Sequence, residues 1–215
     1  MKVTRMTWNL FGENTYFIFD EQSKECFVID PGMMTAAERK NFDTNVAKCG
    51  YIIKAVILTH IHIDHAYSAA YVAEKYNVPI YAGKGEAPLG ASLPEQALRF
   101  HLKGEPIEPL TEYTDIDTVQ NLALGGEKLT HAHIPGHSPD SILIYAPQSD
   151  FALVGDVIFM GSIGRTDLLG GDFDVLANSI RREIYTLPPT TMLLPGHGDP
   201  TSVETEMEFN PFVRP

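Results

Sequence analysis

The stretch Thr59-His60-Ile61-His62-Ile63-Asp64-His65 holds four potential metal ligands within six residues. It follows residues 51–58, an apolar run rich in β-branched side chains whose length is typical of a buried strand. In an extended backbone, side chains two residues apart point to the same side, so the first two histidines can reach one ion. The tighter backbone that follows would turn Asp64 and His65 toward a neighbouring position. Because imidazole and carboxylate together suit zinc or a similar first-row ion, we interpret residues 59–65 as a metal loop rather than a run of surface histidines.

Length and charge narrow the classes of function. At 215 residues the chain can bury a sizeable core, and its 44% hydrophobic and 20% charged residues are ordinary for a globular protein. We expect one domain over residues 1–215, because no repeat, low-complexity tract or linker interrupts the chain. The 16 basic and 28 acidic residues leave a net charge of −12, which argues against broad binding to nucleic acid.

The sequence does not indicate a membrane protein. No window approaches the roughly 20 apolar residues that cross a bilayer, and the N-terminus lacks the apolar stretch of a signal peptide. We therefore expect a cytoplasmic location. Cys26 and Cys49 show no Cys-x-x-Cys spacing, so we interpret both as apolar, buried residues rather than a disulfide or a metal site. Whether the chain is a monomer or a homodimer is left open.

Periodic apolar patterns predict an α/β chain. Residues 15–19 and 26–29 alternate and form a predicted hairpin, and residues 51–82 form a predicted strand–helix–strand crossover with parallel strands. The proline-rich stretch 83–114, with a short helix at 95–102, is interpreted either as one wall of a substrate pocket or as a surface connection. We further predict helices at 35–49, 66–76 and 174–185 (with Asp174 as N-cap), strands at 128–133, 141–145, 151–154 and 191–194, and a surface tail from residue 209.

Three more potential ligands each follow a predicted strand. They are His137 in a Pro-Gly-His-Ser-Pro turn, Asp156 after Gly155, and His197 in a Pro-Gly-His-Gly-Asp turn. A histidine beside glycine is by itself an ordinary turn residue. Together with the metal loop, however, the three supply a seven-residue nitrogen and oxygen ligand set held by the ends of strands. Such a set would hold two divalent ions at the ~3.5–4 Å spacing of binuclear hydrolases.

With these motifs in this order, the chain resembles the metallo-β-lactamase superfamily over nearly its whole length. The flanking segments Asn14-Thr15-Tyr16 and Ile29-Asp30-Pro31-Gly32 agree with the resemblance. It implies an αβ/βα sandwich of four layers, in which two sheets pack face to face with helices outside. It also implies the ligands, which are His60, His62 and His137 for the first metal, Asp64, His65 and His197 for the second, and Asp156 as the bridge.

Within that superfamily, residues 155–167 look like the glyoxalase II group in its short form, without the C-terminal helical domain. The resemblance implies a small hydroxyacylglutathione-type thioester as substrate. Its cofactors would be two divalent metal ions, with zinc expected and iron or manganese also suited to the ligands. A water bridging two such ions loses its proton near neutral pH and would attack the carbonyl, with Asp64 as a catalytic residue that orients it. One departure is Asp140, where relatives usually have glycine; it places a negative charge near the site or caps the turn.

Several roles and functions stay open from the sequence. We interpret Arg165 and Asp167 as a pair that orders the loop under the metals, with direct substrate binding by Arg165 as the alternative. We expect His131 and His133 to be structural or supporting residues rather than ligands, and His101 to be exposed.

The main competing function is a mononuclear iron persulfide dioxygenase, which would use the positions of His60, His137 and Asp156. A non-enzymatic metal-binding domain is the weakest alternative, because all seven ligands are present. A nuclease is disfavoured by the acidic charge and by the absence of a basic arm.

Overall fold

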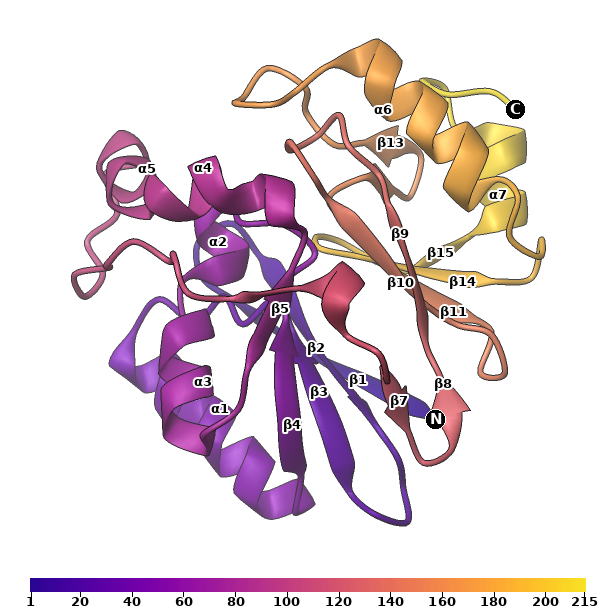
Figure 1. The fold of residues 1–215 in the computed structure, drawn as a ribbon. Coiled ribbons are helices and arrows are strands. Elements are labelled where there is room, and N and C mark those ends of the chain that lie inside the picture. The colour runs from indigo at the N-terminus through magenta and orange to yellow at the C-terminus, as the bar shows by residue number, and fades with distance from the viewer.

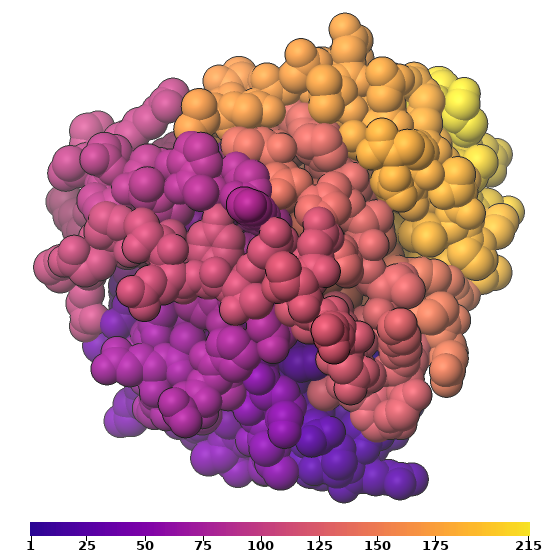
Figure 2. All heavy atoms as spheres, viewed as in Figure 1, coloured from indigo at the N-terminus to yellow at the C-terminus, as the bar shows by residue number.

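Two β-sheets packed face to face, each covered on its outer side by helices, make up the computed structural model of residues 1–215 (Figure 1). This is the predicted α/β, four-layer αβ/βα sandwich. The N-terminal half of the chain builds one sheet with its helices, and the C-terminal half builds the other. In the space-filling view, the segment that links the two halves lies across the face between them (Figure 2).

The first sheet has six strands and mixed direction. Its first three strands are antiparallel neighbours, and the remaining pairings are parallel. Helices α1 (Ala36–Cys49) and α3 (Ala69–Tyr76) cover its outer face (Figure 1). The strands, in spatial order, are β1 (Lys2–Trp8), β2 (Glu13–Phe19), β3 (Glu25–Ile29), β4 (Ile52–Ile57), β5 (Ile80–Ala82) and β6 (Thr114–Asp115).

The second sheet has five strands, in the order β15 (Thr201–Ser202), β14 (Met192–Pro195), β11 (Phe151–Gly155), β10 (Ile142–Ala146) and β9 (Thr130–His133). Only the β11–β14 pairing is parallel. Its outer face is covered by α6 (Phe173–Ser179), its π-helical continuation η3 (Ile180–Ile184), and α7 (Val203–Phe209). The connections carry α2 (Ile63–Ala66), η1 (Lys84–Glu86), α4 (Ala87–Ala91), α5 (Leu93–Arg99), η2 (Ile116–Thr118), and the short strands β7 (Ala123–Leu124), β8 (Glu127–Lys128), β12 (Ile158–Phe159) and β13 (Ser162–Ile163).

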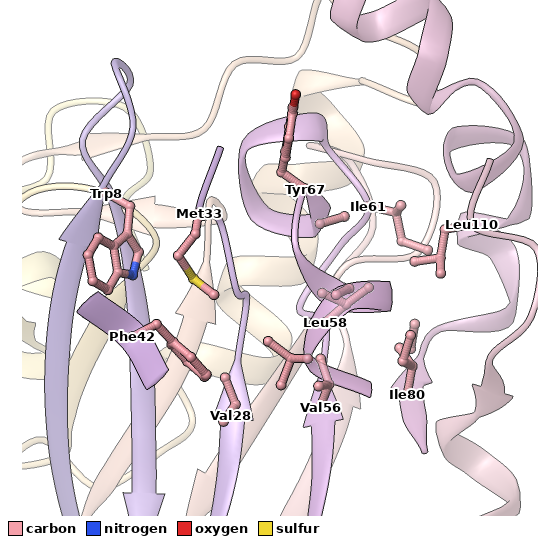
Figure 3. Close-up of a cluster of buried hydrophobic side chains, with 14 of the residues drawn as sticks. Trp8, Val28, Met33, Phe42, Val56, Leu58, Ile61, Tyr67, Ile80 and Leu110 are labelled. Carbon is pink, nitrogen blue, oxygen red and sulfur yellow. The ribbon is translucent and has the colours of Figure 1, made fainter. Parts of the chain in front are cut away.

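Three apolar layers hold the sandwich together, and strand alternation explains why. On β3, Val28 points to the layer under the outer helices, where it meets Phe42 of α1 (Figure 3), whereas Phe27 and Ile29 point to the layer between the sheets. The layer between the sheets joins these side chains to Ile144 and others of the second sheet. Fully burying a side chain of this size contributes about 1.5–3 kcal/mol, so both faces of the sheet stabilise the scaffold under the strand ends.

Most predicted elements are confirmed, including the hairpin, the crossover and the helix at 35–49. Thr35 and Glu38 form a reciprocal capping box, and Gly50 ends the helix in the left-handed conformation. The predicted N-cap at Asp174 is wrong. The helix begins two residues earlier because the Asp172 carboxylate accepts a hydrogen bond from the Val175 backbone N–H.

Besides several short strands and turns, two longer elements were not predicted, β1 and α7. β1 is an edge strand whose side chains are mostly exposed, so its sequence lacks apolar alternation. Both cysteines are free thiols, and Cys26 is buried as predicted. The predicted burial of Cys49 is wrong, because it lies at the end of α1 and is partly exposed. No helix combines the length and the apolar composition needed to cross a bilayer.

Candidate metal centre

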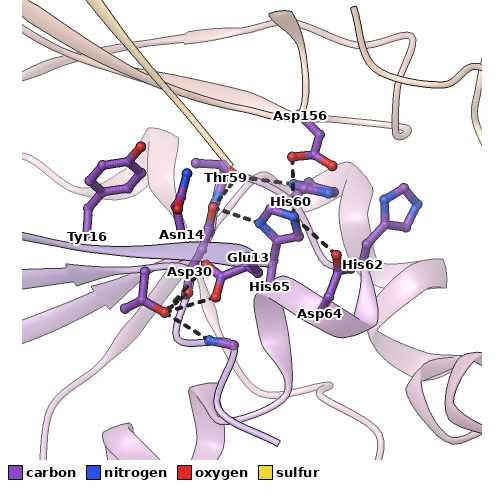
Figure 4. Close-up of polar contacts among 12 residues, drawn as sticks. Glu13, Asn14, Tyr16, Asp30, Thr59, His60, His62, Asp64, His65 and Asp156 are labelled. Carbon is purple, nitrogen blue, oxygen red and sulfur yellow. Dashed lines mark hydrogen bonds and ion pairs between the residues drawn. The ribbon is translucent and has the colours of Figure 1, made fainter. Parts of the chain in front are cut away.

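The seven predicted ligands lie at one edge of the sandwich, where strands from both sheets end. β4 leads into the metal loop, and α2 turns Asp64 and His65 away from the two preceding histidines. β11 and β14 run parallel, so the residues that follow them, Asp156 and His197, emerge at the same edge. The β9–β10 connection adds His137. The structure therefore brings together all seven, and the metal-loop ligands lie beside Asp156 in Figure 4.

His60, His62 and His137 form the first group. The Nε2 atom of His137 lies 3.0 Å from Nδ1 of His62 and 3.3 Å from Nε2 of His60. All three side chains are buried. Three imidazole nitrogens thus converge on one point.

Asp64, His65 and His197 form the second group. The Nε2 atom of His197 lies 3.3 Å from Nε2 of His65 and 3.2 Å from Oδ2 of Asp64, and the latter two atoms are 3.8 Å apart. His65 is fully buried, while Asp64 and His197 are partly exposed toward the cavity. A second point of convergence therefore lies beside the first.

Asp156 lies between the two groups. Its Oδ1 is 3.4 Å from Nε2 of His65, and its Oδ2 is 3.4 Å from Nε2 of His197 and 3.8 Å from Nε2 of His137. Oδ1 is buried without a hydrogen-bond partner. A buried carboxylate oxygen left unpaired is costly, so its placement calls for a cation.

The spacing of these atoms fits metal ions. Two ligands about 2.1 Å from a tetrahedral zinc ion lie about 3.4 Å apart, and most of the spacings above are close to that value. Two nitrogen atoms at this distance cannot both donate a hydrogen bond toward each other. A shared ion between them satisfies both lone pairs.

Oxygen acceptors fix the rings of four of the five histidines through the ring nitrogen that faces away from the cluster. The Nδ1–H of His65 donates to Asp30 Oδ2 at 3.1 Å (Figure 4), and that of His137 donates to the carbonyl of Arg165 at 2.8 Å. The Nδ1 of His197 lies 3.1 Å from the carbonyl of Phe11, and the Nδ1 of His60 lies 3.1 Å from the Thr59 hydroxyl. Such outer partners set the tautomer that leaves the inner nitrogen free to bind a metal.

The charges of the cluster are those of a site built for cations. Burial raises the pKa of Asp156, but the neighbouring His65 and His197 outweigh it and leave that pKa well below its usual value. Burial lowers the pKa of His197, yet hydrogen bonds to Asp156 and Asp64 raise it to about 9. Burial and the neighbouring His137 lower the pKa of His62 to about 3. The cluster therefore keeps anionic carboxylates beside a neutral His62, which is ready to bind metal, and a protonated His197, which must give up a proton to do so.

Glu86 is a functional residue that the sequence did not reveal. Its carboxylate is fully buried, accepts a hydrogen bond from the backbone N–H of Ile61 at 2.8 Å, and also accepts from the Ser138 hydroxyl at 2.6 Å and the Asp140 N–H at 2.8 Å. It thereby ties the metal loop to the turn that carries His137. No sequence signal could have found it, because two of its three partners are backbone amides.

Glycine is required at position 196 because the backbone there passes close to two ligands. A Cβ atom there would lie 2.3 Å from Oδ1 of Asp156 and 2.5 Å from Cε1 of His65. Only glycine lets the backbone before His197 pass under both ligands.

The ligands open into a cavity of about 220 Å³, lined by Phe11, His62, Asp64, Phe100, His137, Asp156, Arg165, Leu168 and His197. A second hollow of about 220 Å³ adjoins it and shares His62, Phe100 and Leu168. Phe100 and α5 belong to the proline-rich stretch, which therefore supplies one wall of the cavity.

Other residues singled out in the sequence are not among the seven ligands, although Arg165 lines the cavity. The Arg165 and Asp167 side chains pair with each other on the surface at 2.7 and 2.8 Å, and only the Arg165 carbonyl reaches a ligand. The predicted pair therefore forms in the loop that supports His137, and its effect on the order of that loop stays a prediction. His101 is exposed, as predicted. His131 and His133 lie on β9 and contact none of the seven ligands, and Asp140 contacts His133.

A family model of the metallo-beta-lactamase superfamily matches residues 8–197. The chain belongs to the metallo-beta-lactamase superfamily. Among the superfamily's curated members, it is 36% identical to the "probable metallo-hydrolase YqgX" of Bacillus subtilis, over 99% of this chain and 98% of that one. It is also 32% identical to the "hydroxyacylglutathione hydrolase GloC" of Haemophilus influenzae, over 94% of this chain and 93% of that one.

Solved structures of the superfamily agree with the fold. The chain superposes on BLEG-1, described as a B3 metallo-beta-lactamase, with a TM-score of 0.85 and 30% identity over 99% of both chains. It superposes on TTHA1623, solved in a di-iron-bound form, with a TM-score of 0.84 and 31% identity over 98% of this chain and all of that one. The fold thus holds two iron ions in TTHA1623.

Proposed function

We propose that this protein is a binuclear metal-dependent hydrolase that cleaves a small acyl thioester of the hydroxyacylglutathione type. The observation that carries the proposal is the pair of three-residue ligand groups with Asp156 between them. The metallo-hydrolase relatives support hydrolysis, and the GloC relative supports a thioester.

In this proposal, His60, His62 and His137 would hold the first ion, and Asp64, His65 and His197 would hold the second. Asp156 would serve both, since its Oδ1 lies near His65 and its Oδ2 lies near both His197 and His137. The site contains only nitrogen and oxygen donors, which zinc, iron and manganese all accept.

Two bound divalent ions would supply an activated water and a polarised carbonyl at neutral pH. The protein's own contribution is to position the reacting groups. The Asp64 carboxylate lines the cavity and can accept a hydrogen bond from a water beside it, which would orient that water toward the acyl carbon. Phe11, Phe100 and Leu168 form apolar walls that hold the acyl chain and exclude bulk water.

The experiment compares substrates and variants on one preparation. We expect thiol release from a hydroxyacyl-glutathione thioester by protein loaded with zinc or iron, with much slower opening of a β-lactam and no oxygen uptake with glutathione persulfide. Asp64→Asn should lower kcat/KM by about 10²-fold or more, because Asp64 both binds metal and orients water. His101→Ala, at an exposed position, is the matched control. Oxygen uptake with persulfide by the iron form, without thioester hydrolysis, would overturn the proposal in favour of a dioxygenase.

A further inference from the structure

A second histidine cluster lies on β9, outside the centre described above. His131 and His133 are two residues apart on this edge strand, so their side chains leave the same face of the sheet. Their ring centroids are 6.0 Å apart. The strand pairs them with Ile144 and Ile142 of β10, whose side chains are buried between the two sheets. The two rings therefore lie at the open border of that layer.

A carboxylate from another part of the chain meets both rings at one atom. Oδ1 of Asp117 lies 2.8 Å from Nε2 of His131 and 3.0 Å from Nε2 of His133. Asp117 belongs to η2, and this turn is anchored because the neighbouring Ile116 is fully buried between the sheets. Two nitrogen atoms and one oxygen atom thus converge from two separately anchored elements.

The ring nitrogen of His133 that faces away from Asp117 has a carboxylate partner, as the outer nitrogen of a metal-binding histidine commonly does. Its Nδ1 lies 2.6 Å from Oδ1 of Asp140, and the other Asp140 oxygen accepts a hydrogen bond from the Gly85 N–H at 2.7 Å. A carboxylate behind a histidine fixes the ring and makes its inner nitrogen a better ligand. This contact gives Asp140 a role beside His133.

The three side chains are open to solvent. The exposed fractions are 25% for His131, 34% for His133 and 59% for Asp117. An ion can therefore enter without opening the fold, and water can complete its coordination. A tetrahedral ion needs ligand atoms about 3.4 Å apart, so the two nitrogen–oxygen distances must lengthen by only about 0.5 Å.

We propose that Asp117, His131 and His133 form a third metal site, which binds one divalent transition ion such as zinc with water as the fourth ligand. None of the three residues lines the cavity of the seven-ligand centre described above, which we call the main centre. The third ion would join η2 to the edge strand β9 and so close the border of the layer between the sheets. Its expected effect is on stability, and the proposal does not depend on the reaction catalysed at the main centre.

The test is equilibrium dialysis of the full-length, metal-stripped protein against zinc chloride at pH 7.5, with elemental analysis. Asp117→Asn and His131→Ala are expected to bind one zinc ion fewer per chain than the unchanged protein, with hydrolysis at the main centre within about twofold of its original rate. His101→Ala is the matched control and should keep the full number. Asp140→Asn should weaken the affinity for this ion about tenfold, since it removes only the outer partner.

Thermal unfolding separates a metal site from a simple hydrogen-bonded trio. With zinc in slight excess over the main centre, the unchanged protein should gain a further rise in Tm that both Asp117→Asn and His131→Ala lose. Equal zinc content in the unchanged protein and both variants would overturn the proposal. The Tm difference between the unchanged protein and the variants could also be the same with zinc as with a chelator. That result would overturn the proposal too, because it would show that the trio stabilises the fold by hydrogen bonding alone.

Discussion

Single residues hold the ligands of the candidate centre in position. Beside the second group, the main such residue is Asp30. Its Oδ1 accepts from the Thr59 N–H at 2.7 Å, and its Oδ2 accepts from the Thr59 hydroxyl at 2.6 Å and from His65 at 3.1 Å. One carboxylate therefore orients the start of the metal loop and the ring of a ligand together. Nothing comparable holds His62, whose Nε2 is buried without a partner.

At the same scale, the protonation of His197 predicts how metal uptake depends on pH. Asp156 and Asp64 raise the pKa of His197 to about 9 in the metal-free protein, so at pH 7 the ring carries a proton that a metal must displace. We expect uptake at pH 7 to release at least one proton per chain, and metal affinity to rise as the pH increases toward 9. Calorimetric titration with zinc in two buffers of different ionisation enthalpy measures the release. His197→Gln should release fewer protons, and a release unaffected by that change would contradict this assignment.

At the scale of elements, Glu86 is the connection between loops that lie far apart in sequence. η1 delivers its carboxylate to the metal loop on one side and to the His137 turn on the other. The two loops come from different sheets, so their relative position depends on this contact as well as on the apolar layer between the sheets.

Glu86→Gln tests that connection. The amide can accept at only one of its two ends, so a buried N–H or hydroxyl loses its partner, at a cost of about 1–3 kcal/mol in the free energy of unfolding. We expect that loss in chemical denaturation, together with weaker binding of the metals, because the two ligand loops are no longer tied. Glu95→Gln, on the exposed side of α5, is the control and should leave both unchanged. Full stability and unaltered metal affinity in Glu86→Gln would show that the loops hold their positions without this carboxylate.

The elements also show which features of the fold and the site can be predicted from the sequence. The metal loop was predictable because its ligands lie within six residues and follow an apolar strand, and the layers were predictable from the resemblance to a superfamily. The role of Glu86 and the meeting of Asp117 with β9 were not, since these contacts join segments with no shared local pattern. α7 is rich in glutamate and shows apolar residues on one side only weakly, so it was not recognised despite its Ser202 cap.

Across the whole molecule, the two sheets bring ligands from both halves of the chain to one edge. His60, His62, Asp64 and His65 come from the first half, and His137, Asp156 and His197 from the second. Neither half of the chain alone contains the complete ligand group of either ion. The centre therefore depends on the packing of the sheets, and the buried layer between them is what preserves its geometry.

The most direct test is an anomalous difference map from crystals of the metal-loaded protein, recorded at the absorption edge of the metal. The account predicts two peaks about 3.5–4 Å apart, one against His60, His62 and His137 and one against Asp64, His65 and His197, with Asp156 between them. A single peak at the first group, with none beside the second, would contradict the binuclear centre.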